Sequence, residues 1–398
     1  MKEKAIVITD RIVEYSLYGL ILFIPVSKAA IEIFASFAVL AFIIKKIFLP
    51  EFKFVKSKTY IFLLLFIIFS ELSLIHSGPY LEKSIKALSL TWLKYISIFL
   101  IVEDTLFTHK RIRNAILILL TMGGVVAIDA LSQHFFGCEF LRGRQIKGGM
   151  YFITGPFHHH NALAAYLVCI LAFMLVLLSC VKFKKKIYYF GQFFLVVFLG
   201  LSFLFTFSRG GWIGFIAAVL LILFLSRKWK VILPVIFIFI LLVSLVPAIR
   251  ERAIFTFQAG GDSNRFSMWK GAWAMIKENP FLGKGLGTFM AYFPKYTVGL
   301  GIQYAHNSFL QIWAESGVFS LLSLLNFLTL VLWQGVKSFR KSQDYFILGL
   351  LCAIFGFLVH SLFDNHLYSL QLSVLFWSLL GILSALINLT TNSIKVKE

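Results

Sequence analysis

The chain has 398 residues, of which 59% are hydrophobic and only 14% are charged. A soluble domain averages about 45–50% apolar and about 25% charged residues, so this composition excludes a soluble protein and predicts a surface that mostly faces lipid. The formal net charge is +20. In a membrane protein lysine and arginine set the topology, so we expect membrane lipids as partners and no nucleic acid.

Apolar runs long enough to cross about 30 Å of hydrocarbon occur about twelve times along the chain. They cover residues 12–28, 29–48, 59–76, 86–102, 114–134, 161–181, 188–207, 210–226, 231–249, 306–334, 345–362 and 369–389. The sequence therefore predicts an all-α polytopic membrane protein with about twelve transmembrane helices. Residues 1–398 are predicted to form a single membrane domain, with residues 250–305 as a loop insertion between the ninth and tenth spans.

The positive charges alternate along the chain in the way that the positive-inside rule describes. An even number of spans places both termini on one side, and most of the 38 Lys and Arg residues lie in the segments on that side. This pattern predicts that both termini are cytoplasmic. Two segments on the opposite side, near residues 135–160 and 250–305, are nevertheless rich in cations. An anionic ligand explains this excess most simply, and anionic lipid headgroups are the alternative.

Residues 250–305 are predicted to contain a short amphipathic helix on the outer membrane face. Asp262 or Ser263 is suited to cap it, and Asn279 with Pro280 is expected to end it. Its apolar residues recur at spacings of three and four, at Phe266, Trp269, Trp273 and Ile276. A turn with three alternating glycines follows, and it leads to His306.

Three cation-bearing sites fall on the predicted outer face, at Arg209, Arg265 and His306. Arg209 follows Ser208 between two spans, Arg265 lies in the first turn of the surface helix, and His306 precedes the tenth span. Helix N-termini and arginine forks together suit a diphosphate. The alternatives are that Arg209 snorkels to headgroups, that Arg265 pairs with Asp262, and that His306 and Asn307 satisfy free N–H groups at a helix start.

Further candidates for contacts with a polar ligand lie in the same outer segments. Arg142 and Arg144 precede a run of histidines, His160 and Asn161 open the sixth span, and Lys284 lies in the Gly-rich turn. Three consecutive histidines at 158–160 point in different directions from a helix, so they make a poor metal-ligand set. Paired carboxylates that would hold a metal against a diphosphate are missing from the outer segments. We therefore expect no metal and no cofactor.

Glu315 is a carboxylate at membrane depth, which is a functional candidate by default. It lies nine residues after His306, on nearly the opposite face of the helix. Direct contact with that histidine is not expected, and a structural hydrogen bond to a neighbouring span is an equal alternative to a role in chemistry.

These residues resemble the motifs of the O-antigen ligase family, within a wider group that includes O-antigen polymerases and O-oligosaccharyltransferases. The resemblance rests on Ser208-Arg209-Gly210, on Arg265 followed by Trp and Ala, and on "NPFLGKGLGTF" from Asn279 to Phe289. It also rests on His306-Asn307 followed by Gly317, whereas Ser320 departs from the last position of that motif. The architecture matches over most of the chain and the motifs over about 150 residues, which identifies the group better than its individual members.

The resemblance implies a GT-C-like membrane glycosyltransferase of the bacterial inner membrane with its active site facing the periplasm. The donor would be a glycan on undecaprenyl diphosphate, and the acceptor would be the sugar of lipid A–core. Arg209 and Arg265 would neutralise the diphosphate, and His306, with Asn307 as its orienter, would be the general base. The reaction would be metal-independent and would invert the anomeric centre.

Two other functions remain open from the sequence. An O-antigen polymerase uses the same donor but another lipid-linked repeat as its acceptor. A transporter or flippase also suits twelve spans, although transporters place polar and broken-helix features near the bilayer midplane, often in two matching halves. Here no internal repeat is found, and the polar groups cluster toward one face.

Overall fold

A computed structural model describes residues 2–52, 59–145, 152–182, 185–245, 247–254, 263–297 and 303–395. Within these ranges the fold is helical throughout, and one isolated bridge joins Cys138 to Gln145. This confirms the predicted all-α class. The helices are α1 (Lys2–Phe23), α2 (Lys28–Phe48), α3 (Thr59–Leu72), α4 (Leu81–Ala87), α5 (Leu93–Thr105), α6 (His109–Phe136), α7 (His160–Cys180), α8 (Lys186–Leu204), α9 (Arg209–Ser226), α10 (Trp229–Leu245), α11 (Pro247–Ile254), α12 (Ser263–Glu278), α13 (Phe289–Tyr292), α14 (Ser308–Ser342), α15 (Tyr345–His360) and α16 (Leu370–Lys395).

Short non-α turns connect several of these helices. A π-helical segment, Leu88–Trp92, joins α4 to α5, and a 3-10 turn, His366–Tyr368, precedes α16. Eight segments of the described chain are long and apolar enough to cross a membrane, and each coincides with a predicted run. They are Thr59–His76, Gly78–Thr105, His109–Phe136, His160–Cys180, Lys186–Leu204, Arg209–Ser226, Ser308–Ser342 and Leu370–Thr391. The protein is thus a multi-pass membrane protein, and the full count of twelve spans stays a prediction.

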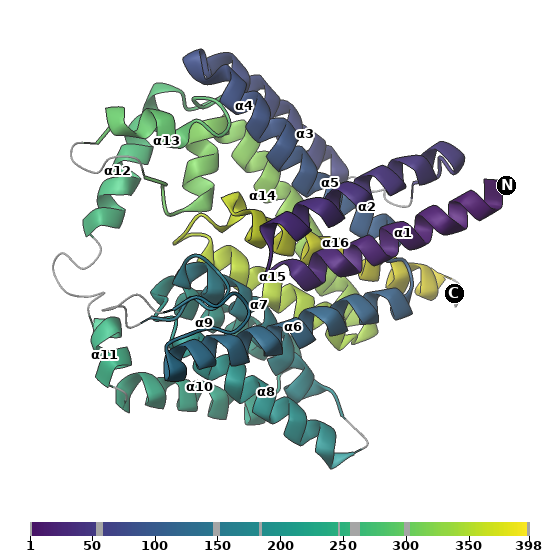
Figure 1. The fold of residues 1–398 in the computed structure, drawn as a ribbon, viewed down its shortest axis with the longest axis vertical. Helices are drawn as coiled ribbons and strands as arrows, with labels where there is room; N and C mark the ends of the chain where they lie inside the picture. Colours follow the sequence, from purple (N-terminus) through teal and green to yellow (C-terminus); the bar gives the residue numbers. More distant parts are fainter. Residues whose placement is uncertain are drawn as a thin grey trace.

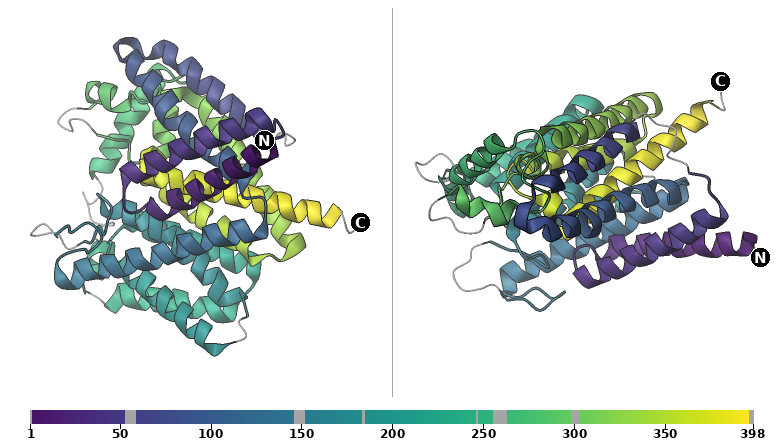
Figure 2. Two further views of the ribbon diagram at one scale, coloured as in Figure 1. Left: turned by 45° about the vertical axis from the view of Figure 1, so that its right-hand side comes forward. Right: turned by 90° about the horizontal axis from the view of Figure 1, so that it is seen from above.

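The centre of the bundle is formed by α7 and α16, whose apolar windows are 89% and 83% buried inside the protein. α15 packs against α7 and α9, α14 packs against α3, and α16 packs against α5. Small residues allow some of these contacts to be close, since a Cβ on Gly214 would lie 2.6 Å from the carbonyl oxygen of Gly356. Both termini lie at one end of the bundle, and α12 and α13 lie at the other (Figures 1 and 2).

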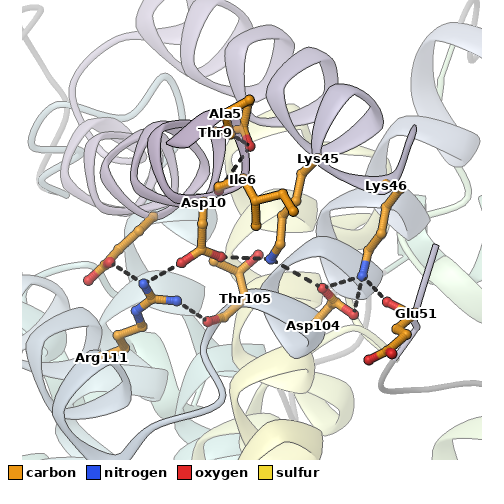
Figure 3. Close-up of polar contacts among 11 residues, drawn as sticks. Ala5, Ile6, Thr9, Asp10, Lys45, Lys46, Glu51, Asp104, Thr105 and Arg111 are labelled. Atoms are coloured by element: carbon orange, nitrogen blue, oxygen red, sulfur yellow. Dashed lines mark hydrogen bonds and ion pairs between the residues drawn. The ribbon is translucent and has the colours of Figure 1, made fainter. Parts of the chain in front are cut away.

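A cluster of buried ion pairs ties the first two helices to the rest of the bundle at the end where the termini lie (Figure 3). Lys45 of α2 pairs with Asp10 of α1 at 2.7 Å, and Lys46 pairs with Asp104 of α5 at 2.8 Å. Arg111 of α6 donates to Asp10 as well. Removing one partner of a buried pair typically costs about 3–5 kcal/mol because a charge is left uncompensated. The cluster therefore fixes α2 in place beside α5.

Candidate active site

A cavity of about 290 Å³ lies at the end of the bundle opposite the termini, where several helices begin. Its walls come from four parts of the chain that are far apart in sequence: the start of α2, the start of α7, the residues before α14 and the segment before α16. The side chains that line it include Lys28, His158, His159, His306, Asp364 and Tyr368. His306, the predicted general base, therefore lines a cavity large enough to admit substrate groups.

His306 is placed by the start of α14. Asn307 is the N-cap of that helix, and its side-chain oxygen accepts hydrogen bonds from the backbone N–H groups of Phe309 and Leu310, both at 3.0 Å. His306 itself adopts the left-handed region with φ 47°. This conformation is uncommon for residues other than glycine and tends to persist where the surrounding structure enforces it, often at functional sites.

The partner of His306 is Asp364, which the sequence analysis did not single out. Nδ1 of His306 lies 3.2 Å from Oδ1 of Asp364. Asn307, the predicted orienter, caps α14 through Oδ1, as the alternative for this residue described, and its role beside His306 stays a prediction. No spacing pattern connects residues 306 and 364, because they are brought together only by the packing of α14 against the segment between α15 and α16.

Asp364 is held as a carboxylate by its surroundings. Burial raises its pKa, but the hydrogen bond from His306, the nearby His366 and the backbone N–H of Asn365 outweigh burial and hold the pKa well below its usual range. The Asn365 N–H donates to Oδ1 at 2.8 Å, and the side-chain amide of Asn161 donates to Oδ2 at 2.7 Å. A charged Asp364 is suited to orient an imidazole and to stabilise it when it takes up a proton.

Asn161 connects this pair to the second predicted motif. Its Oδ1 accepts a hydrogen bond from the hydroxyl of Ser208 at 2.7 Å. Ser208 is the N-cap of α9, so Arg209 begins that helix next to the chain His306–Asp364–Asn161–Ser208. Gly210 is required there, since a Cβ would lie 2.8 Å from the Cβ of Phe363. The Ser-Arg-Gly motif is thus packed directly against the segment that carries Asp364.

Arg265 lies in the first turn of α12 and acts on the same cavity by its charge. The pKa of His366 is lowered to about 4, mainly by burial; the charge of Asp364 opposes this shift, and the charge of Arg265 contributes to it. Burial also lowers the pKa of His159, again with Arg265 contributing and Asp364 opposing. His159 and His366 are therefore neutral near pH 7, and the cavity's electrostatics are governed by permanent charges.

Three helix N-termini surround this region, at the starts of α7, α9 and α14. Their caps are His159, Ser208 and Asn307. Each N-terminus adds positive potential and free N–H groups. The combination of three N-termini with arginines is suited to bind a phosphate group.

The remaining predicted ligand-binding residues have structural partners. His160 contacts the carbonyl of Thr206 through Nδ1 at 2.8 Å and joins α7 to the turn before α9. Arg142 donates to the carbonyl of Pro156 at 3.0 Å, and Arg144 donates to that of Phe157 at 2.8 Å, so both hold the turn before His158. In the described ranges, no group of three His, Cys, Asp or Glu side chains is arranged to hold a metal ion.

Lys284 is paired within its own loop, with Glu278. The same loop supplies hydrogen-bond partners for the carboxylate of Glu315, which is buried in α14. Glu315 accepts hydrogen bonds from the backbone of Gly287 at 2.8 Å and of Phe289 at 3.1 Å. Tyr368 donates to Glu315 as well, at 3.1 Å. These contacts support a structural role for Glu315, but its partners lie in the Gly-rich loop and in the turn before α16, whereas the sequence suggested a neighbouring span.

The Gly-rich turn docks into a break in α14 at Gly317, where φ is 79° and ψ is 173°. The backbone of Lys284 donates to Ala314 at 3.0 Å, and that of Gly285 donates to Glu315 at 2.8 Å. Beyond the break, Val318 donates to the carbonyl of Pro280 at 2.9 Å. The loop thus completes hydrogen bonds that the broken helix leaves open.

The predicted apolar stripe of α12 is only partly correct. The buried face is formed by Met268, Ala272, Met275 and Ile276. Phe266 and Trp273, which were predicted to belong to the stripe, are 59% and 44% exposed. In a membrane protein an apolar side chain is stable facing either protein or lipid, so apolar spacing alone does not identify the packed face.

We expect Gly317→Ala to undock the Gly-rich turn. A Cβ at residue 317 would lie 1.9 Å from the carbonyl oxygen of Phe281, and the positive φ disfavours any L side chain. The expected result is faster proteolysis within residues 250–305 and a lower melting temperature. Gly191→Ala is the matched control, because a Cβ there meets nothing within 4 Å. Equal behaviour of the two variants would contradict the docking role.

Comparison with known families gives one finding. Residues 194–325 match the family model for O-antigen ligase. This match supports an O-antigen ligase family assignment. The matched part contains Arg209, Arg265 and His306 and ends before Asp364. A comparison with curated proteins finds no match. The match supports an enzyme of the O-antigen ligase or polymerase type, and that family implies a lipid-linked glycan donor and a lipid acceptor in the membrane.

Proposed function

We propose that this protein transfers a glycan from undecaprenyl diphosphate to the lipid A–core acceptor at the periplasmic face of the inner membrane. The observation that carries the proposal is the hydrogen-bonded chain from His306 through Asp364 and Asn161 to Ser208. This series of hydrogen bonds connects His306, the proposed base, to the start of α9, which carries Arg209.

The proposed reaction is a single displacement at the anomeric carbon of the donor. The acceptor hydroxyl oxygen attacks, the bond from the anomeric carbon to the phosphate oxygen breaks, and the diphosphate leaves with the bonding electrons. His306 takes the hydroxyl proton, and Asp364 stabilises the resulting imidazolium. Attack opposite to the leaving group inverts the anomeric centre.

The departing diphosphate gains negative charge as the bond breaks. Arg209, Arg265 and the N-termini of α7 and α9 are proposed to stabilise this charge. Arginine remains charged at any physiological pH and offers a planar fork to phosphate oxygens. This is the basis for proposing a reaction that needs no metal.

The test is transfer by the purified protein in lipid vesicles with a defined undecaprenyl-diphosphate glycan. Lipid A–core and a second lipid-linked glycan are offered separately as acceptors, with and without excess chelator. We expect product with lipid A–core in both conditions. Product formed only with the second lipid-linked glycan would indicate a polymerase, and activity that disappears in chelator and returns with Mg²⁺ or Mn²⁺ would contradict the metal-free mechanism.

A further inference from the structure

A second, larger hollow lies next to the cavity. It is a groove of about 820 Å³ between α2 and the segment that runs from the π-helical turn into α5. Its α2 wall runs from Glu32 to Ile43, which corresponds to about 16 Å of helix. Leu40 is 58% exposed and Leu90, on the opposite wall, is 64% exposed, so membrane lipid can reach the groove from the side.

The groove and the active-site cavity adjoin each other. Tyr368 lines both of them. Lys28 lines the cavity and Glu32 lines the groove, and these residues lie one turn apart on the same face of α2. A molecule lying in the groove would therefore have its end at Glu32 about one turn of α2 away from Lys28, which lines the same cavity as His306.

The lining of the groove is partly polar although it lies along apolar helices. Lys94 pairs with Glu32 at 2.6 Å, and their side chains are 20% and 47% exposed. The hydroxyl residues Ser36, Ser89, Thr91 and Ser97 also line it. Ionisable groups within apolar spans are costly and usually mark a functional surface. The adjoining wall is π-helical at Leu88–Trp92, a distortion that is often found at functional sites.

A contrasting pocket lies on the opposite side of the bundle, along the helix that Arg209 begins. It has a volume of about 200 Å³ between α7, α8, α9 and α10, with lining residues that include Leu171, Leu204 and Phe215. No charged side chain lines it in the described part of the chain. An uncharged polyprenyl chain needs no polar partner, so this pocket suits the donor's tail better than the polar groove does.

We propose that the α2–α5 groove binds the membrane-embedded, acylated and phosphorylated part of the acceptor glycolipid, with Lys28 facing its anionic head. The head of such a lipid carries amide, ester, hydroxyl and phosphate groups, which match the polar stripe and the cation. The groove adjoins the cavity at Tyr368, and His306, the proposed base for the acceptor hydroxyl, lines that cavity. The identity of this lipid rests on the proposed function.

The experiment measures lipid binding by the purified full-length protein in nanodiscs, with lipid A–core glycolipid and undecaprenyl diphosphate as separate probes. Ser36→Trp fills the groove from α2, and Leu90→Trp fills it from the other wall. Ile33→Trp is the control, because Ile33 is exposed on α2 outside the groove lining. Gly200→Trp fills the opposite pocket, where a Cβ meets nothing within 4 Å.

We expect each groove variant to weaken glycolipid binding about tenfold or more and to leave undecaprenyl diphosphate binding unchanged. Gly200→Trp should weaken undecaprenyl diphosphate binding and leave glycolipid binding unchanged. Ile33→Trp should change the binding of neither lipid. Retained binding of undecaprenyl diphosphate shows that a variant is folded. Two outcomes would overturn the assignment of the groove to the acceptor glycolipid. In the first, the groove variants lose only undecaprenyl diphosphate binding; in the second, they bind both probes as the wild type does. Binding requires no turnover, so a wild type that binds both lipids but transfers no glycan would refute the proposed function and leave this inference standing.

Discussion

His306→Ala is expected to abolish glycan transfer while the protein still inserts into the membrane. Loss of a general base typically lowers the rate by about 10²–10⁴-fold, and His306 is a histidine of the cavity that is hydrogen-bonded to a carboxylate, that of Asp364. The measurement is transfer by purified protein, with lipopolysaccharide that carries O-antigen as the readout in cells.

The left-handed backbone at His306 calls for a second variant. Alanine is disfavoured at φ 47°, whereas asparagine tolerates this region. His306→Asn therefore keeps the backbone and removes the base, and it should be as inactive as His306→Ala. His109→Ala is the control, because His109 is exposed at the start of α6 and is remote from the cavity. Normal transfer by His306→Asn would exclude His306 as the base.

Asp364→Asn is expected to reduce the transfer rate by roughly 10²-fold or more, because the imidazole loses its orienting charge. An amide also stabilises an imidazolium less than a carboxylate does. The acidic limb of the pH–rate profile should therefore move to lower pH. If Asp364 had only a structural role, the substitution would lower the melting temperature without moving this limb. The pH–rate profile therefore distinguishes a residue that positions His306 from one that only stabilises the fold.

The control for Asp364→Asn is Leu362→Ala, which lies on the same turn and is 41% exposed. Its rate and its pH profile should match the wild type. A rate loss in Asp364→Asn with an unmoved acidic limb would contradict the proposed action of Asp364 through His306.

The sequence was a good guide wherever local chemistry determined structure. Apolar runs predicted the eight segments of the described chain that are able to cross a membrane, and Ser208 and Asn307 begin the expected helices. It was a poor guide to contacts between distant segments. Asp364 is 58 residues from His306 in sequence, and no periodic pattern links an isolated carboxylate to a helix start elsewhere.

The face of α12 could not be predicted for a different physical reason. Its apolar residues cover more than one side of the helix, and lipid accepts an aromatic side chain as readily as protein does. Tight packing selected Ala272 and the flexible Met275 instead of the bulky Trp273. Volume and shape, rather than hydrophobicity, decided which side faces the bundle.

The break in α14 also limits how relatives of this protein can be recombined. The Gly-rich turn and residues 314–318 complete each other's backbone hydrogen bonds, and Glu315 accepts from the turn as well. A chimera that exchanges residues 250–305 alone would combine the loop of one protein with the broken α14 helix of another, and their backbone hydrogen bonds would not be matched. If the start of α14 as far as Val318 is exchanged together with the loop, those hydrogen bonds are kept. A graft of this loop must therefore include the first turns of the membrane helix that follows it.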